Sequence, residues 1–184
     1  CLLYGILILA GRAYFDRPNT NAWNWRKLMG WWNLTLSVFS AIGFSKTLPQ
    51  LLHNLYYFTL EENLCSDPEY FYGSGSTGLW VQLFVLSKFP ELLDTFFIVI
   101  HKKKLLFLHW YHHITVLLYC WHSYVTKTPS GLFFCVMNYG VHSVMYFYYF
   151  LMAIKIRPPW AMMVTSLQIS QMMVGVVLTV LGFI

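Results

Sequence analysis

The chain has 184 residues, of which 58% are hydrophobic and 10% are charged, whereas an ordinary globular domain has about 25% charged residues. This composition excludes a typical soluble domain and indicates a membrane protein surrounded by lipid. The formal net charge of +5 does not indicate a nucleic-acid partner, because the basic residues stand in short clusters between apolar runs.

Six apolar runs, separated by short polar segments, predict an all-α chain that folds as a polytopic membrane helix bundle. The predicted transmembrane helices cover residues 1–15, 30–58, 79–100, 105–124, 131–153 and 160–184. The first and last runs are cut inside apolar sequence. We therefore interpret residues 1–184 as a single transmembrane domain and as a fragment of a longer protein.

The distribution of basic residues predicts the orientation of these helices. Nine of the 12 Lys and Arg residues fall in alternate loops: Arg12, Arg17, Arg26, Lys27, Lys102, Lys103, Lys104, Lys155 and Arg157. Loops rich in Lys and Arg stay on the cytosolic side of a membrane. We therefore expect these loops in the cytosol and the acidic segment near 61–69 on the opposite side.

The predicted helix at 105–124 carries three histidines in its first turns. His109, His112 and His113 stand at i, i+3 and i+4, so their side chains share one helical face. Polar side chains at bilayer depth are costly, and they usually face a protein interior or a wet cavity. This histidine face is therefore a candidate functional site.

The predicted helix at 79–100 contains three charged residues at three-residue spacing. Lys88 and Glu91 can pair with each other, which leaves Asp94 for a neighbouring helix. Pro90 has no N–H and releases the carbonyl group of Leu86 from the helix ladder. We expect a local distortion beside this charged cluster.

Two further predicted helices carry polar side chains at helical spacing: Asn138, His142, Tyr146 and Tyr149 in 131–153, and Gln168 and Gln171 in 160–184. Counted from the nearest cytosolic basic residue, one or two polar groups of each of the four helices lie roughly 12–20 Å deep: His112, Asp94, Glu91, Gln168 and His142. Polar residues can simply join membrane helices by hydrogen bonds. A shared depth favours a polar active site in the cytosolic half of the bilayer.

Two kinds of chemistry use clustered intramembrane histidines. Non-haem di-iron desaturases and hydroxylases bind metal through several histidine boxes, but this chain has seven histidines and one box. Acyl transfer needs one imidazole as nucleophile or base, and neighbouring donors for the developing oxyanion. The residues favour acyl transfer, and a transporter or receptor with buried charges is the alternative outside enzymes.

Four motifs resemble those of the fatty acid elongases, the ELO family of 3-oxoacyl-CoA synthases. They are KFPELLDT at 88–95, LHWYHH at 108–113, NYGVHSVMYFYY at 138–149 and TSLQISQ at 165–171. All four occur in the family's order. The sequence around the second and third motifs looks most like that of the family members that act on saturated and monounsaturated acyl chains.

The resemblance implies a multi-pass enzyme of the endoplasmic reticulum membrane with seven helices, six of which form a barrel around an acyl tunnel. Its active site would open to the cytosol. It would condense a long-chain acyl-CoA with malonyl-CoA to 3-oxoacyl-CoA, CO2 and CoA, with no metal and no cofactor beyond these substrates. The other enzymes of the elongation cycle and a second copy of the chain are the expected protein partners.

The resemblance also implies roles for single residues. His112 would take the acyl group as an acyl-imidazole, with His142 opposite it and with Asn138, His109 and His113 orienting or donating. The supporting residues would be Lys88, Glu91, Asp94, Tyr146, Tyr149, Gln168 and Gln171. Lys102, Lys103 and Lys104 could hold CoA phosphates. Cys65 would pair with a cysteine beyond Ile184.

Overall fold

The computed structural model describes residues 2–17 and 19–182, and these residues contain helices and connecting loops without a β-strand. The helices are α1 (Leu2–Phe15), α2 (Arg26–Tyr57), α3 (Leu60–Cys65), α4 (Pro68–Phe71), α5 (Gly75–Ser87), the 3-10 helix η1 (Pro90–Leu92), α6 (Leu93–Ile100), α7 (Phe107–Val125), α8 (Gly131–Ala153) and α9 (Ala161–Leu181). The all-α prediction is confirmed. Residue 1 and residues 183–184, at the outer ends of the first and last predicted helices, lie outside the described residues.

The predicted helix at 79–100 is not one continuous element, and the local distortion expected beside the charged cluster is confirmed. The chain there forms α5, the turn η1 and α6, with the break between Ser87 and Leu93. Proline cannot donate a backbone hydrogen bond, and its ring collides with the carbonyl group four residues earlier. Pro90 therefore ends α5 and turns the segment that carries Lys88 and Glu91 into the bundle.

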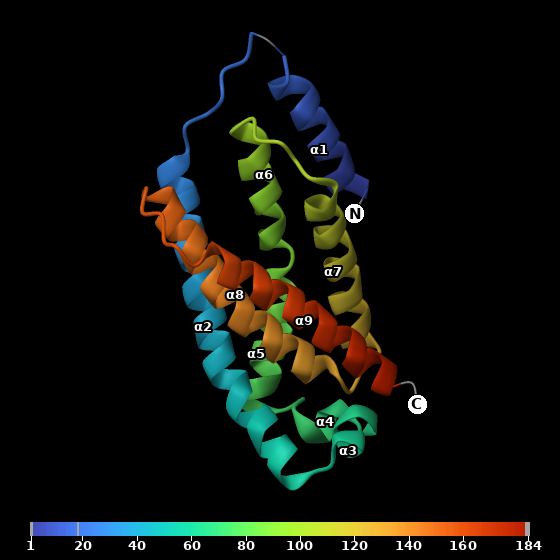
Figure 1. Cartoon of the computed structure of the whole chain (residues 1–184). Coiled ribbons are helices and arrows are strands. Elements are labelled where there is room, and N and C mark those ends of the chain that lie inside the picture. The colour runs from blue at the N-terminus through green and yellow to red at the C-terminus, as the bar shows by residue number, and fades with distance from the viewer. Residues whose placement is uncertain (1, 18, 183–184) are drawn as a thin grey trace.

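The most extensive helix packing joins α2 to α8, and α2 runs along the left side of the bundle with α8 beside it (Figure 1). Gly43 on α2 lies directly against the ring of Tyr139 on α8, and Gly140 lies against the ring of Phe44. Small residues of this kind allow membrane helices to approach closely. The hydroxyl of Tyr139 donates to the carbonyl oxygen of Trp80 at 2.9 Å, which ties α5 to this pair.

Contacts between loops define the two ends of the bundle. At one end, Arg26 donates to the carbonyl oxygen of Ala153 at 2.7 Å, and Lys102 donates to that of Thr20 at 2.5 Å. At the other end, Glu69 and Lys127 form an ion pair. The loop between α1 and α2 and the short helices α3 and α4 lie at these opposite ends (Figure 1). The basic loops thus gather at one end, and the cytosolic location of that end stays a prediction.

The exterior of the bundle is apolar and several polar groups lie inside. Met162 and Val176 on α9 are 83% and 62% exposed, whereas Lys88 is 3% exposed. By length and hydropathy, α9 is the one helix among the described residues that could cross a membrane alone, and α1 is apolar but shorter. The number of membrane-spanning helices therefore stays a prediction.

Candidate active site

The break at Pro90 brings a buried ion pair into the bundle. Lys88 Nζ lies 2.8 Å from Glu91 Oε1, and the two side chains are 3% and 7% exposed. Ser87 Oγ donates to the same carboxylate oxygen at 3.0 Å. The predicted pairing of Lys88 with Glu91 is thus confirmed. A buried ion pair needs such additional hydrogen bonds, because both charges have lost their water.

The ion pair continues into α8 through an asparagine. Lys88 Nζ donates to Asn138 Oδ1 at 3.0 Å, and Asn138 Nδ2 lies 3.1 Å from His142 Nε2. On the other side of the ring, His142 Nδ1 lies 3.9 Å from Glu91 Oε2. Four predicted site residues therefore form a single connected network: Lys88, Glu91, Asn138 and His142.

Asp94 finds its partners on two other helices, as its position in the sequence predicts. Trp32 Nε1 on α2 donates to Asp94 Oδ1 at 2.8 Å, and the hydroxyl of Tyr146 on α8 donates to Asp94 Oδ2 at 2.7 Å. Tyr146 is only 2% exposed. Both carboxylate oxygens are thereby satisfied, and α2, α6 and α8 are joined at one point.

The histidine face of α7 meets α6 and α1. His109 Nε2 lies 3.0 Å from Thr95 Oγ1, and Thr95 Oγ1 lies 2.5 Å from the hydroxyl of Tyr4. The rings of His109 and His113 have centroids 4.6 Å apart, and those of His112 and His113 are 5.8 Å apart. The three imidazoles are clustered as predicted, and one of them is anchored.

His112 and His113 differ from the other site histidines in having free ring nitrogens. Among the described residues, no hydrogen bond involves the ring of either histidine, and the one fully buried side-chain nitrogen or oxygen without a partner is Nε2 of His101. The ring nitrogens of His112 and His113 are therefore unpaired without being fully buried. Among the residues that the structure describes, no hydrogen bond joins His112 to His142. That the two rings face each other therefore stays a prediction.

Some predicted site residues lie outside the network. Gln168 Nε2 lies 3.0 Å from Met145 Sδ, which connects α9 to α8 without reaching a charged group. Gln171 is partly exposed. Tyr149 is 42% exposed, and among the described residues no hydrogen bond joins it to Asp94. Among the described residues, no hydrogen bond joins any of these three to the charged groups of the network, and their support of the site stays a prediction.

The three lysines at 102–104 have different environments. Lys102 adopts a left-handed backbone with φ of 53° at the end of α6, as Lys127 and Lys155 do at the ends of α7 and α8. This conformation commonly terminates helices, although glycine usually provides it. Because the Lys102 amine is also bonded to loop carbonyl groups, only Lys103 and Lys104 project freely among the three.

Sequence reasoning missed four residues of the site. Trp32 is a donor to Asp94, Ser87 is a donor to Glu91, and Tyr4 and Thr95 lead to His109. Thr95 had a signal, because it closes the first motif. The other three had none, because an interfacial tryptophan, a serine near a helix end and a tyrosine in an apolar run are common in membrane helices.

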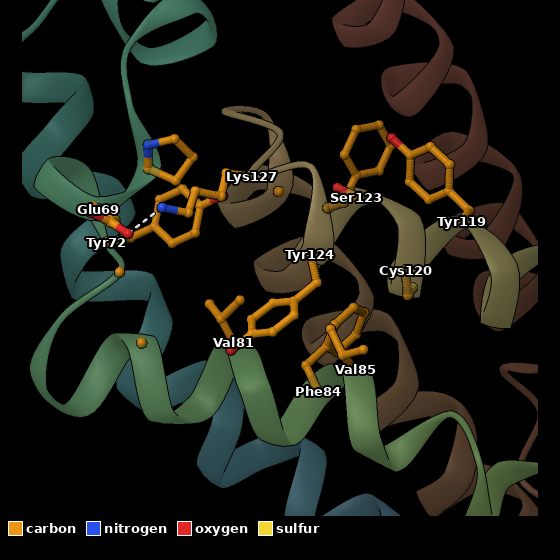
Figure 2. A pocket seen from close by; sticks show the side chains of 15 residues that line it. Glu69, Tyr72, Val81, Phe84, Val85, Tyr119, Cys120, Ser123, Tyr124 and Lys127 are labelled. Carbon is orange, nitrogen blue, oxygen red and sulfur yellow. Dashed lines mark hydrogen bonds and ion pairs between the residues drawn. The ribbon is translucent and has the colours of Figure 1, made fainter.

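A cavity of about 240 Å³ lies between α5 and α7, toward the end of the bundle that holds α3 and α4. Val81, Phe84 and Val85 line it from α5, and Cys120 lines it from α7 (Figure 2). The Glu69–Lys127 ion pair stands at its edge. Tyr119, the first residue of α7 that lines the cavity, follows His113 by six residues, so the cavity begins about 9 Å along α7 from the histidines.

Tyr72 and Lys127, in the loops at this end, have perturbed pKa values. Burial raises the pKa of Tyr72, whose hydroxyl donates to the carbonyl oxygen of Thr128 at 2.9 Å. The hydrogen bond to Glu69 raises the pKa of Lys127. Both groups therefore keep their protons at neutral pH. Cys65, at the end of α3, is exposed and free, so its disulfide stays a prediction.

An apolar exterior around an internal polar site with accessible imidazoles defines a helical membrane protein with a candidate active site. The family model described as GNS1/SUR4 matches residues 1–184, and the chain belongs to this ELO family, whose elongases are membrane proteins.

Several relatives share this assignment. The chain is similar to very long chain fatty acid elongase 6 of Drosophila melanogaster, with 45% identity over 182 residues that make up 98% of this chain and 57% of the relative. The Gallus gallus protein of the same name is 45% identical, and that of Homo sapiens is 43% identical, each over 183 residues, 98% of this chain and 68% of the relative. The chain thus spans between 57% and 68% of these relatives' lengths.

Proposed function

We propose that the protein performs the condensing step of fatty acid elongation, in which a long-chain acyl-CoA and malonyl-CoA give 3-oxoacyl-CoA, CO2 and CoA. One observation carries this proposal. In the described residues, His112 has ring nitrogens without a hydrogen bond, whereas His109 and His142 are already engaged by separate sets of partners. A free imidazole next to fixed donors is the arrangement that nucleophilic acyl transfer requires.

In the proposed reaction, a ring nitrogen of His112 attacks the thioester carbonyl carbon. The carbon–sulfur bond breaks, the imidazole loses a proton, and the CoA thiolate takes up this proton and leaves as the thiol. Malonyl-CoA then loses CO2. The electron pair of the broken carbon–carbon bond remains on the α-carbon as an enolate. This carbon attacks the acyl-imidazole, the carbon–nitrogen bond breaks, and the imidazole recovers a proton from water, because the overall reaction consumes one proton.

The remaining site residues would support these steps. His113 lies beside His112 and can donate to the developing oxyanion, because its ring nitrogens are also free. His109 is held by Thr95 and would orient the cluster. Lys88, Glu91 and Asp94 have fully engaged side chains, so they would hold the bundle in shape.

We also propose that the helices cross the endoplasmic reticulum membrane several times and enclose an acyl tunnel. The apolar exterior supports placement in lipid, and the gathering of basic loops at one end supports a cytosolic orientation. The acyl chain would extend from His112 toward the cavity beside Cys120, whose lining from α5 is apolar. Lys103 and Lys104, at the basic end, would attract the phosphates of CoA.

The test uses the full-length protein in detergent and the variant His112→Ala. His122→Ala is the matched control, because His122 is an exposed histidine near the end of the same helix. Two quantities are measured: 3-oxoacyl-CoA formed from labelled malonyl-CoA, and label retained on the protein after incubation with labelled acyl-CoA alone. The wild type and His122→Ala should show both signals, and His112→Ala should show neither while eluting as a folded protein. Normal product formation by His112→Ala would refute the nucleophile role.

A further inference from the structure

The chemistry of three side chains determines which nitrogen of His142 carries the proton. A lysine ammonium can only donate hydrogen bonds. Lys88 Nζ lies 3.0 Å from one end of the Asn138 amide, so that end must be the oxygen. The amide NH2 group then faces His142 Nε2 at 3.1 Å. Because an amide NH2 group can only donate, Nε2 must accept and carries no proton.

The other ring nitrogen of His142 completes this assignment. A neutral imidazole has one protonated nitrogen, so its proton lies on Nδ1. Nδ1 lies 3.9 Å from Glu91 Oε2, a carboxylate oxygen whose neighbour Oε1 accepts from Lys88 and Ser87. The proton therefore points toward negative charge, and the environment of both nitrogens favours the same tautomer.

We propose that Lys88 is a positioning residue that sets the tautomer of His142 through the amide of Asn138. Lys88 is buried. Its ammonium group is held by the carboxylate of Glu91 and by the face of the Phe84 ring, whose centroid lies 4.2 Å from Nζ. Its charge thus has one available hydrogen-bond acceptor beyond the ion pair, which is Asn138 Oδ1. The break at Pro90 places Lys88 where it can reach α8.

This assignment gives His142 a defined part in the reaction, which rests on the proposed function. Nε2 accepts from Asn138 and Nδ1–H faces Glu91, so both ring nitrogens are occupied. The neutral ring is thereby held in one orientation and does not act as a base at Nε2. His142 is then a fixed neutral imidazole of the site, and His112 is left as the nucleophile.

The first test measures the tautomer and does not depend on catalysis. The full-length protein is labelled with 15N-histidine, and its solid-state NMR spectrum is compared with that of His142→Gln to identify the His142 signals. The wild type should show the Nδ1–H form. Asn138→Asp keeps the bond to Lys88 but replaces the donor with a second acceptor, so the proton should move to Nε2. An Nε2–H signal in the wild type, or an unchanged signal in Asn138→Asp, would overturn the proposal.

Lysine variants provide the second arm. Lys88→Met should broaden or mix the two tautomer signals, because nothing then fixes the amide, and Lys88→Arg should restore the Nδ1–H form. Lys46→Met is the matched control, since Lys46 is exposed on α2 and outside the network. If Lys88→Met does not fold, Lys88→Arg and Asn138→Asp still decide the question. A wild-type spectrum in Lys88→Met would show that Lys88 has no positioning role.

Kinetics then separate this inference from the proposed function. Asn138→Asp should lower kcat for condensation by about 100-fold, the loss that a misplaced group in an active site can cause, with KM for acyl-CoA within about twofold of the wild type. The predicted tautomer in an enzyme that forms no 3-oxoacyl-CoA would support the positioning role and refute the proposed function. Full activity in Asn138→Asp with an inverted tautomer would refute the part assigned to His142.

Discussion

Replacing Lys88 with methionine should destabilise the protein by about 3–5 kcal/mol, because it leaves the carboxylate of Glu91 charged inside the bundle. Glu91 is 7% exposed at its side chain and would retain one hydrogen bond, from Ser87. Asn138 Oδ1 would also lose its donor. Methionine has a similar length, so little of the loss would come from packing.

The opposite variant, Glu91→Gln, should cost less. The glutamine oxygen can still accept from Lys88, and the ammonium group keeps Asn138 and the ring of Phe84. The double variant Lys88→Met, Glu91→Gln should be more stable than Lys88→Met alone by about 2 kcal/mol, because no uncompensated charge remains.

Thermal unfolding in mild detergent, followed by tryptophan fluorescence, measures these differences. For a chain of this size, 1 kcal/mol shifts Tm by about 2–4 °C, so Lys88→Met should melt roughly 6–20 °C below the wild type. Lys46→Met controls for the loss of a lysine charge. A Tm for Lys88→Met within about 2 °C of the wild type, or a double variant below both single variants, would refute the reasoning.

Two further predictions concern packing and pH. Gly43→Ala should destabilise the protein by about 1–3 kcal/mol, because its new Cβ would lie 2.6 Å from ring carbons of Tyr139. The control Gly5→Ala should be neutral, because Gly5 has open space around it. Equal Tm values for the two variants would contradict this prediction. The backbone N–H of Thr59 and then its hydroxyl donate to Glu62 and lower the pKa of this carboxyl group below its ordinary value of 4.5. The capping box at the start of α3 therefore stabilises this helix above about pH 4.5, and the stabilisation is lost as the pH falls through the lowered pKa. Hydrogen exchange of the α3 amides, corrected for intrinsic rates, should increase from about pH 6 to about pH 3, and unchanged protection would count against the capping box.

Much of the site could be predicted from helical spacing. Lys88 and Glu91 stand three residues apart, and His109, His112 and His113 share a face, and the structure confirms both relations. Spacing also indicated that Asp94 needs a partner on another helix. Local periodicity carries this information because it depends only on the geometry of one helix.

The partners of these residues could not be predicted in the same way. Nothing in the sequence near Asp94 indicates Trp32 or Tyr146, which lie 62 and 52 residues away. The rotation of each helix about its axis, and the neighbour that it meets, depend on packing such as the contact of Gly43 with Tyr139.

The composition and periodicity of the chain thus established an all-helical membrane protein and the face of each helix that carries polar groups. The link from Lys88 through Asn138 to His142, and the break at Pro90 that makes this link possible, required the packed bundle. The physical reason is that a hydrogen bond between helices forms only when two rotations and two depths agree. These quantities depend on the balance of contacts across the whole bundle.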